Sequence, residues 1–351
     1  MSLLPPSLLQ HTLWEEDKNP IWLGSSLTLQ RNLAQAKFPS KLSEADQSSV
    51  SASLKELFQK TTSLKSPSYL AAQTVSPLDK EYLFEHFLCL ESFQDAGTGQ
   101  AFVIDSEGAF LALINLKNHL QLQLFETSGD LLSAWNRLSH LETEIGQKLD
   151  YAFSPKFGFL TSDPSQCGTA LRAVTYLHVP ALHHTGKLHE TLKTQESDSV
   201  LTLGLEGALD DLVGDFLLLK NRYTLGISEE EILQSLQLTA SQLTNIEKAL
   251  RPTLKDNASI KDLVSRAWGL LTNAYQLQTK EALNALSALK LGLDLGWISG
   301  ISVQALHTLF FQCRRAHLAH LLQDKHLGTQ DLTQQRAEFI KQALQGVDYS
   351  R

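Results

Sequence analysis

Apolar residues recur at helical spacing in the early part of the chain and then change to an alternating pattern. Over 42–58 the apolar positions follow Ser43, a favourable N-cap residue, at the spacing of one helix face, which predicts a helix. A second helix is predicted over 77–90. Two partly alternating apolar runs over 100–126, separated by turn residues, predict consecutive antiparallel strands.

The second half of the chain mixes strands with helices and then becomes helical. A helix is predicted over 128–149, a strand over 170–179, and two further strands within the apolar runs 199–207 and 216–226. From Ser228 onward the spacing of apolar residues is almost wholly helical. Strands and helices followed by helices alone predict an α+β fold with a helical C-terminal part.

The proline at the end of the first long C-terminal helix marks the predicted domain boundary. We expect residues 1–252 to form one α+β domain, in which residues 1–90 are mostly helical. Residues 253–351 are expected to form a separate helical domain. Each part is long enough to bury a core of its own.

Composition narrows the classes of partner. The net charge is -8 and no basic stripe is present, so we expect no nucleic-acid partner. The 3 cysteines lie far apart without metal-type spacing, which fits a reducing compartment. The N-terminal stretch lacks the basic residues of a signal peptide, and no apolar run approaches the roughly 20 residues that span a bilayer. We therefore expect a cytoplasmic protein without a membrane partner.

The predicted strand 170–179 carries two residues suited to binding an anion. Alternation places Arg172 and His178 on the same face, beside a loop rich in Ser, Gly and Thr. A guanidinium presents several N–H donors in a fixed planar arrangement that matches a phosphate, so this face could bind a phosphate group. The alternative, which spacing alone favours, is a solvent-facing arginine and a histidine at the edge of the core.

A histidine-rich segment follows this strand. His183, His184 and His189 could ligate a metal ion, but Glu190 is the only acidic residue beside them in the sequence. A solvated loop is therefore favoured over a metal site. We expect no metal in this protein.

Several ordered sequence blocks resemble a known family. The block 159–182, FLTSDPSQCGTALRAVTYLHVPAL, resembles the ATP:guanido phosphotransferases, and within them the bacterial protein-arginine kinases. WLGSSLTLQRNLAQAKFP (22–39), LINLKNHLQLQ (113–123) and NRYTLGISEEEI (221–232) resemble further family blocks in the same order. The resemblance implies a phosphagen-kinase-like antiparallel sheet domain flanked by helices, followed by an all-helical dimerisation domain.

The resemblance also implies where the family's nucleotide site should lie. The family transfers the γ-phosphoryl group of ATP with Mg²⁺ and a cage of arginines. Two residues expected at this site are retained, Arg172 and His178. The other four arginine positions carry neutral side chains, namely Ser26, Thr28, Gln121 and Leu203.

The positions that the resemblance assigns to the guanidino substrate have changed as well. The family's glutamates orient the guanidinium and accept its proton, and a loop cysteine contacts it. The glutamate positions fall on Leu116 and Lys117, and the cysteine position falls on Asp163. In the C-terminal domain, the segment 332–337 has Leu332 and Thr333 at the Arg-Asp pair of the family's phosphoarginine-reading segment and keeps its later Arg336 and Ala337.

We therefore expect a catalytically inactive homodimer with a regulatory or interaction role and no cofactor. The resemblance suggests a zinc-binding activator protein or a Clp-type unfoldase as partner. One alternative is an active, divergent kinase that uses ATP and Mg²⁺, with Asp163 pairing with a guanidinium and Lys117 meeting a phosphate. Another is a sensor of small guanidino compounds through Asp163.

Overall fold

The computed structural model describes residues 2–10, 12–14, 19–195, 197–323 and 329–350. Contacts divide the chain into two compact units, each made of three segments. The first unit comprises Met1–Leu13, Ser25–Val174 and Lys220–Leu236, and the second comprises Trp14–Gly24, Thr175–Leu219 and Gln237–Arg351. The predicted division of the sequence at residue 252 remains a prediction.

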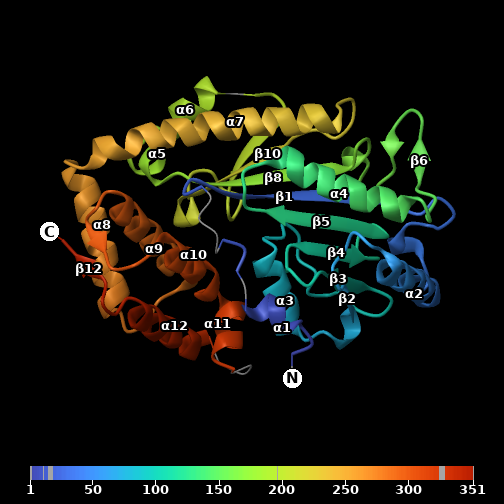
Figure 1. The fold of residues 1–351 in the computed structure, drawn as a ribbon, viewed down its shortest axis with the longest axis horizontal. Coiled ribbons are helices and arrows are strands. Elements are labelled where there is room, and N and C mark those ends of the chain that lie inside the picture. The colour runs from blue at the N-terminus through green and yellow to red at the C-terminus, as the bar shows by residue number, and fades with distance from the viewer. Residues whose placement is uncertain (1, 11, 15–18, 196, 324–328, 351) are drawn as a thin grey trace. The chain divides into compact units, whose positions relative to one another are not determined.

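Eight strands form one large sheet, and helices flank it (Figure 1). This arrangement confirms the predicted fold class. The strand order is β2-β3-β4-β5-β1-β8-β10-β9. Neighbours are antiparallel from β2 through β5 to β1. The bounds are β1 Trp22–Arg31, β2 Ser68–Ala71, β3 Ala101–Ile104, β4 Phe110–Ile114, β5 Leu120–Glu126, β8 Leu171–His178, β9 Val200–Gly204 and β10 Phe216–Asn221.

The helices and two small hairpin sheets account for the remaining regular structure. The early helices are α1 Pro6–Gln10, α2 Glu44–Lys60, α3 Pro77–His86, α4 Leu131–Gly146, α5 Pro180–His184 and α6 Leu188–Thr194. The later helices are α7 Glu229–Leu250, α8 Ala258–Asn273, α9 Thr279–Asp294, α10 Val303–Gln312, α11 Arg315–Leu321 and α12 Thr329–Ala343. The small sheets pair β6 Phe153–Ser154 with β7 Gly158–Phe159, and β11 Ile298–Ser299 with β12 Asp348–Tyr349.

Local capping explains where several helices begin. The side chain of Ser43 accepts a hydrogen bond from the backbone N–H of Asp46 at 3.2 Å, which confirms the predicted N-cap of α2. Asp130 caps α4 in the same way, accepting from the Ser133 N–H at 2.9 Å. These caps satisfy N–H groups that have no partner within the helix.

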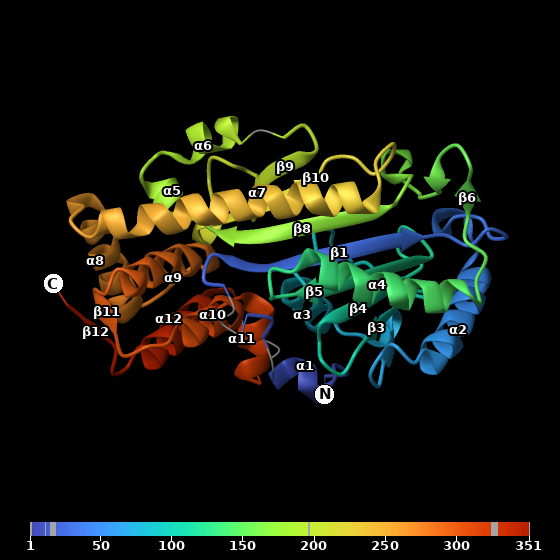
Figure 2. The same ribbon diagram turned by 45° about the horizontal axis from the view of Figure 1, so that its top comes forward.

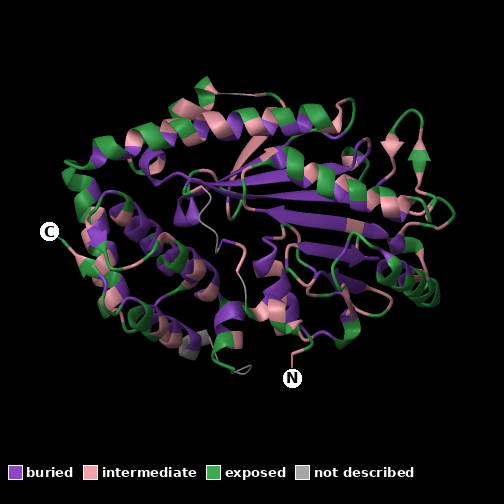
Figure 3. Ribbon diagram, in the orientation of Figure 1, coloured by how far each residue is buried: buried purple, intermediate pink, exposed green. Residues whose placement is uncertain are grey.

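The central strands are buried on both faces (Figure 3). Every position of β1, β3, β4 and β8 is buried. In the first unit α4 packs against β5, as Figures 1 and 2 show, and in the second unit α8 packs along α9. Among the described residues, no helix combines the length and the apolar character that crossing a bilayer requires.

Candidate functional site

The loop between β7 and β8 is held by its own backbone and by a neighbouring segment. Thr169 donates its N–H to the carbonyl of Thr224 at 2.9 Å, and the Thr224 hydroxyl donates to the carbonyl of Cys167 at 2.8 Å. Gly168 has φ +105, and a Cβ there would lie 2.1 Å from the Thr224 oxygen. Glycine is therefore the residue that permits this close approach.

Asp163 occupies the loop position assigned to the guanidinium-facing cysteine, and its carboxylate is used locally. It caps the short 3-10 turn Pro164–Gln166, accepting from the N–H of Ser165 at 3.0 Å and from the Ser165 hydroxyl at 2.7 Å. Hydrogen bonds from Ser165 lower the pKa of this exposed carboxyl. Asp163 is therefore ionised at neutral pH and serves as an N-cap.

Arg172, the retained cage arginine, is buried and bound to a carboxylate. One of its terminal nitrogens lies 3.3 Å from one carboxylate oxygen of Glu91, and Nζ of Lys117 lies 3.0 Å from the other. The expectation of a solvent-facing arginine is therefore wrong. Glu91 was not singled out in the sequence, because it lies in a connecting segment without a recognisable motif and meets Arg172 only in the folded chain.

A third cation lies near the same carboxylate. The pKa of Lys220 is lowered, first by burial and then by the positive charge of Arg172, while Glu91 opposes this shift. Cys89 lies nearby, and burial raises the pKa of its thiol to about 12, so it supplies no thiolate at neutral pH. Glu91, Arg172, Lys117 and Lys220 thus form a charged centre, and Asp95 lines the adjoining cavity.

Two small cavities of the first unit bring several of the predicted site residues together. A cavity of about 200 Å³ is lined by Arg172, Gln121, Leu116, Lys117 and Glu91, among others. A second cavity of about 280 Å³ shares Gln121, Leu116, Lys117 and Glu91 with the first and is also lined by Asp163. Each volume lies below the roughly 300–1,000 Å³ of typical small-molecule sites.

Ser26 and Thr28 lie within strand β1 and are buried. Ser26 pairs in register with Phe125, and Thr28 pairs with Gln123 on β5. Neither position brings a positive charge to the sheet. Together with neutral Gln121, they leave the first unit with one of the four cage arginines that the resemblance assigns to it.

His178 and Leu203 belong to the second unit. Leu203 is half-buried within β9. His178 is fully buried, and its Nε2 lies 2.7 Å from the hydroxyl of Ser287. Burial, together with the nearby charges of Lys290 and Arg251, lowers the pKa of His178 well below its usual range. The ring is therefore neutral and forms part of a polar core network.

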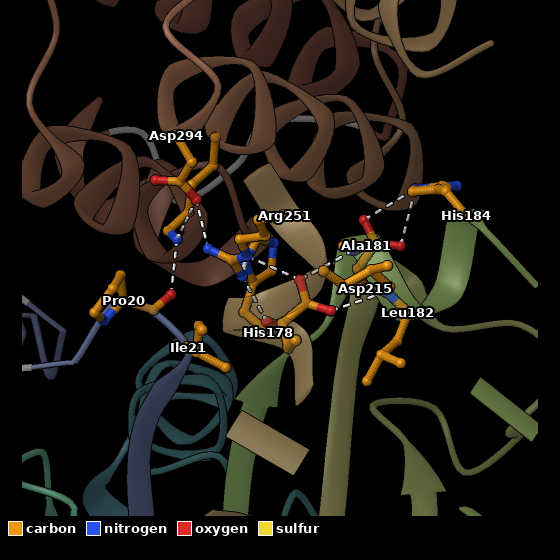
Figure 4. Close-up of polar contacts among 12 residues, drawn as sticks. Pro20, Ile21, His178, Ala181, Leu182, His184, Asp215, Arg251 and Asp294 are labelled. Atoms are coloured by element: carbon orange, nitrogen blue, oxygen red, sulfur yellow. Dashed lines mark hydrogen bonds and ion pairs between the residues drawn. The ribbon is translucent and has the colours of Figure 1, made fainter. Parts of the chain in front are cut away.

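That network is drawn in Figure 4 and surrounds the guanidinium of Arg251. Arg251 donates to Glu247 at 2.8 Å, to Asp294 at 2.5 Å and to the carbonyl of His178 at 2.9 Å. Glu247, itself fully buried, also accepts the N–H groups of Ala181 and Leu182 at 3.0 and 2.8 Å. These contacts fix the start of α5 to α7.

Models of two protein families match the chain. The ATP:guanido phosphotransferase C-terminal catalytic domain matches residues 48–250, and the protein-arginine kinase McsB C-terminal domain matches residues 257–351. A protein-arginine kinase from Chlamydia pneumoniae is 34% identical over 355 residues, covering 98% of each chain. A protein-arginine kinase from Halothermothrix orenii is 31% identical, covering 94% of this chain and 96% of its own.

Solved structures share the fold at lower identity. A duplicated taurocyamine kinase from Schistosoma mansoni, with bound transition state analog components, matches with a TM-score of 0.59 and 22% identity. That match covers 71% of this chain and 37% of the other. A lombricine kinase matches with a TM-score of 0.58 and 19% identity, covering 71% of this chain and 72% of the other. These likenesses concern the fold alone.

Proposed function

This chain belongs to the protein-arginine kinases of the ATP:guanido phosphotransferase family, and from that membership we propose that it is a pseudokinase. It keeps the family fold, transfers no phosphoryl group, and acts as a regulatory or interaction protein. The observation that carries this proposal is the contact between Arg172 and Glu91. The one retained cage arginine has its charge met by a carboxylate of the same chain.

The chemistry of phosphoryl transfer supports the proposal. Transfer from ATP requires several positive charges around the triphosphate, because negative charge must be neutralised as the group moves. Removing a single transition-state partner costs on the order of 10²- to 10³-fold in rate. Here four cage positions are neutral, at Ser26, Thr28, Gln121 and Leu203.

The positions that would bind the guanidino acceptor lack a carboxylate that could act as general base. A guanidinium hardly loses its proton at neutral pH, so a positioned carboxylate must orient it and take its proton. The two positions assigned to that carboxylate are Leu116 and Lys117, and neither is an acid. Asp163 is ionised, but its Oδ1 caps its own turn and its Oδ2 accepts a hydrogen bond from the side chain of Gln166.

One observation favours the alternative of an active, divergent kinase. Lys117 and Lys220 join Arg172 around Glu91, so cationic side chains that could meet a phosphate remain there. Such an enzyme would have to recruit a base from elsewhere in the chain. Formation of phosphoarginine by the protein distinguishes the active-kinase alternative from the pseudokinase proposal.

The test is phosphoryl transfer. The full-length protein is incubated with ATP, Mg²⁺ and an arginine-rich protein substrate, and acid-labile phosphate is measured on substrate and on the protein itself. A protein-arginine kinase from the family, assayed in parallel, is the positive control. We expect no acid-labile phosphate above the level without enzyme. Phosphoarginine formed in proportion to enzyme concentration would establish the alternative.

The proposed interaction role includes a homodimer and a protein partner. The match of residues 257–351 to the C-terminal domain of a protein-arginine kinase supports this part of the proposal. By family resemblance, the partner would be a zinc-binding activator protein or a Clp-type unfoldase. Light scattering coupled to size-exclusion chromatography, with and without each purified candidate, tests both statements.

A further inference from the structure

Two adjacent histidines converge on one buried carboxylate in the second unit. His183 Nδ1 lies 2.6 Å from Oδ1 of Asp215, and His184 Nε2 lies 3.1 Å from the same oxygen. One ligand atom from each of the three residues lies within 4.8 Å of the others. The sequence offered only Glu190 as an acidic neighbour and therefore missed Asp215.

The backbone around Asp215 is unusual in a way that orients its side chain. Asp215 has φ +57 and follows Gly214 at φ +63, so two consecutive residues adopt the left-handed conformation. This conformation costs a non-glycine residue on the order of 1 kcal/mol or more and persists where the surroundings require it. Here it turns the carboxylate toward His183 and His184, at the end of α5.

A further hydrogen bond holds the Asp215 carboxylate in place. The hydroxyl of Ser287 on α9 hydrogen-bonds Oδ2 of Asp215 and also contacts the buried ring of His178. Metal-binding carboxylates are commonly oriented by such outer hydrogen bonds.

The two rings are reachable from solvent, and a cavity opens beside them. Their side chains are 30% and 26% exposed, whereas Asp215 is 4% exposed. The cavity measures about 540 Å³ and is lined by His183, His184 and Asp215 together with mostly apolar residues of α8 and α9. A metal held by three protein ligands with an open side is the arrangement that binds a further ligand.

We propose that His183, His184 and Asp215 form a binding site for a divalent transition metal of the zinc class, with an open coordination position facing this cavity. Imidazole nitrogens favour zinc, cobalt or nickel over magnesium and calcium, which prefer oxygen. Ligand atoms around a tetrahedral zinc lie roughly 3.3 Å apart, given bonds of about 2.0–2.1 Å. The three side chains reach that spacing with small rotations, the metal replacing the hydrogen-bonded protons between them.

The test is titration of the full-length, untagged and chelator-treated protein with Co²⁺ alone, followed by its visible absorption. The variants are His183→Gln and His184→Gln, at partly exposed positions that tolerate a polar side chain. His189→Gln is the matched control, because His189 lies in the same segment but beside exposed Asp210. Circular dichroism confirms that each variant is folded.

We expect one equivalent of Co²⁺ to bind, with each of the two variants weakening the affinity at least tenfold and the control staying within threefold of wild type. Absence of stoichiometric binding overturns the proposal and leaves a hydrogen-bonded His–Asp cluster. Binding that survives in either variant, or that the control loses to the same extent, also overturns it, because the metal would then lie elsewhere.

Discussion

Glu91 binds the guanidinium of Arg172 at 3.3 Å, and the two side chains differ sharply in exposure. The arginine side chain is 8% exposed and the glutamate side chain is 33% exposed. The carboxylate is thus more exposed than the cation that it binds. Its second oxygen is also engaged, with Lys117 at 3.0 Å. We therefore expect Glu91 to compete with an incoming phosphate for both cations.

Replacing this carboxylate should expose the cations to an external anion. We expect Glu91→Gln to raise the affinity for inorganic triphosphate about tenfold, which equals about 1.4 kcal/mol. Isothermal titration calorimetry measures the change. Glu107→Gln is the matched control, since it removes an exposed carboxylate paired with Lys65, and it should leave the affinity unchanged. Equal affinities in the wild type and Glu91→Gln would contradict this account of the centre.

The close approach at Gly168 should make that position intolerant of a side chain. A Cβ would lie 2.1 Å from the Thr224 carbonyl, and φ is +105, so we expect Gly168→Ala to destabilise the protein by about 2 kcal/mol or more. Gly269→Ala, in the middle of α8 with nothing within 4 Å of its Cβ, should be neutral or stabilise by up to about 1 kcal/mol. Urea unfolding distinguishes the two. Similar midpoints for both variants would refute the packing argument.

Glu247 should contribute far more to stability than a surface carboxylate. It is fully buried and accepts hydrogen bonds from Arg251 and from two backbone N–H groups. Glu247→Ala leaves these donors without that acceptor and should cost about 3–5 kcal/mol. Asp262→Ala breaks an exposed pair with Arg266 and should cost less than about 1 kcal/mol. Chemical unfolding measures the free energy of unfolding of both variants. If their losses differ by less than about 1 kcal/mol, the stabilising role of the Glu247 network is contradicted.

Stability should fall as the pH drops below neutrality. Burial and the charge of Lys290 lower the pKa of His307 from 6.5 to about 3, so between these values the unfolded chain binds a proton that the folded chain does not. One such proton lowers the free energy of unfolding by about 1.4 kcal/mol per pH unit across that window. His307→Gln should reduce the slope between pH 6 and pH 5 measured by urea unfolding, whereas exposed His140→Gln should not. An unchanged slope in His307→Gln would exclude His307 as a contributor.

Local sequence chemistry was sufficient to predict much of the fold. Ser43 caps α2 because its hydroxyl meets an N–H three residues ahead, an interaction that needs no tertiary contact. The alternation over 170–179 likewise predicted β8, although burial of every position in it depends on what covers each face of the sheet. Patterns of this kind predict where helices and strands lie, but they do not indicate which polar side chains contact one another in the folded chain.

The site was less predictable because its central contacts join distant segments. Glu91 lies 81 positions before Arg172, and Asp215 lies 32 positions after His183. Neither acid carries a motif, so the sequence alone suggested an anion-binding face and a solvated histidine loop. The family resemblance supplied the positions of the kinase-like site, but it could not supply Glu91, which acts through the folded arrangement.

The central claim is tested most directly by calorimetric titration of ATP with Mg²⁺ into the full-length wild-type protein. The pseudokinase proposal predicts no binding with a Kd below about 100 µM, which corresponds to about -5.5 kcal/mol. A Kd below that value, lost in Arg172→Gln but retained in a surface variant such as Arg266→Gln, would contradict the proposal and establish a working nucleotide site.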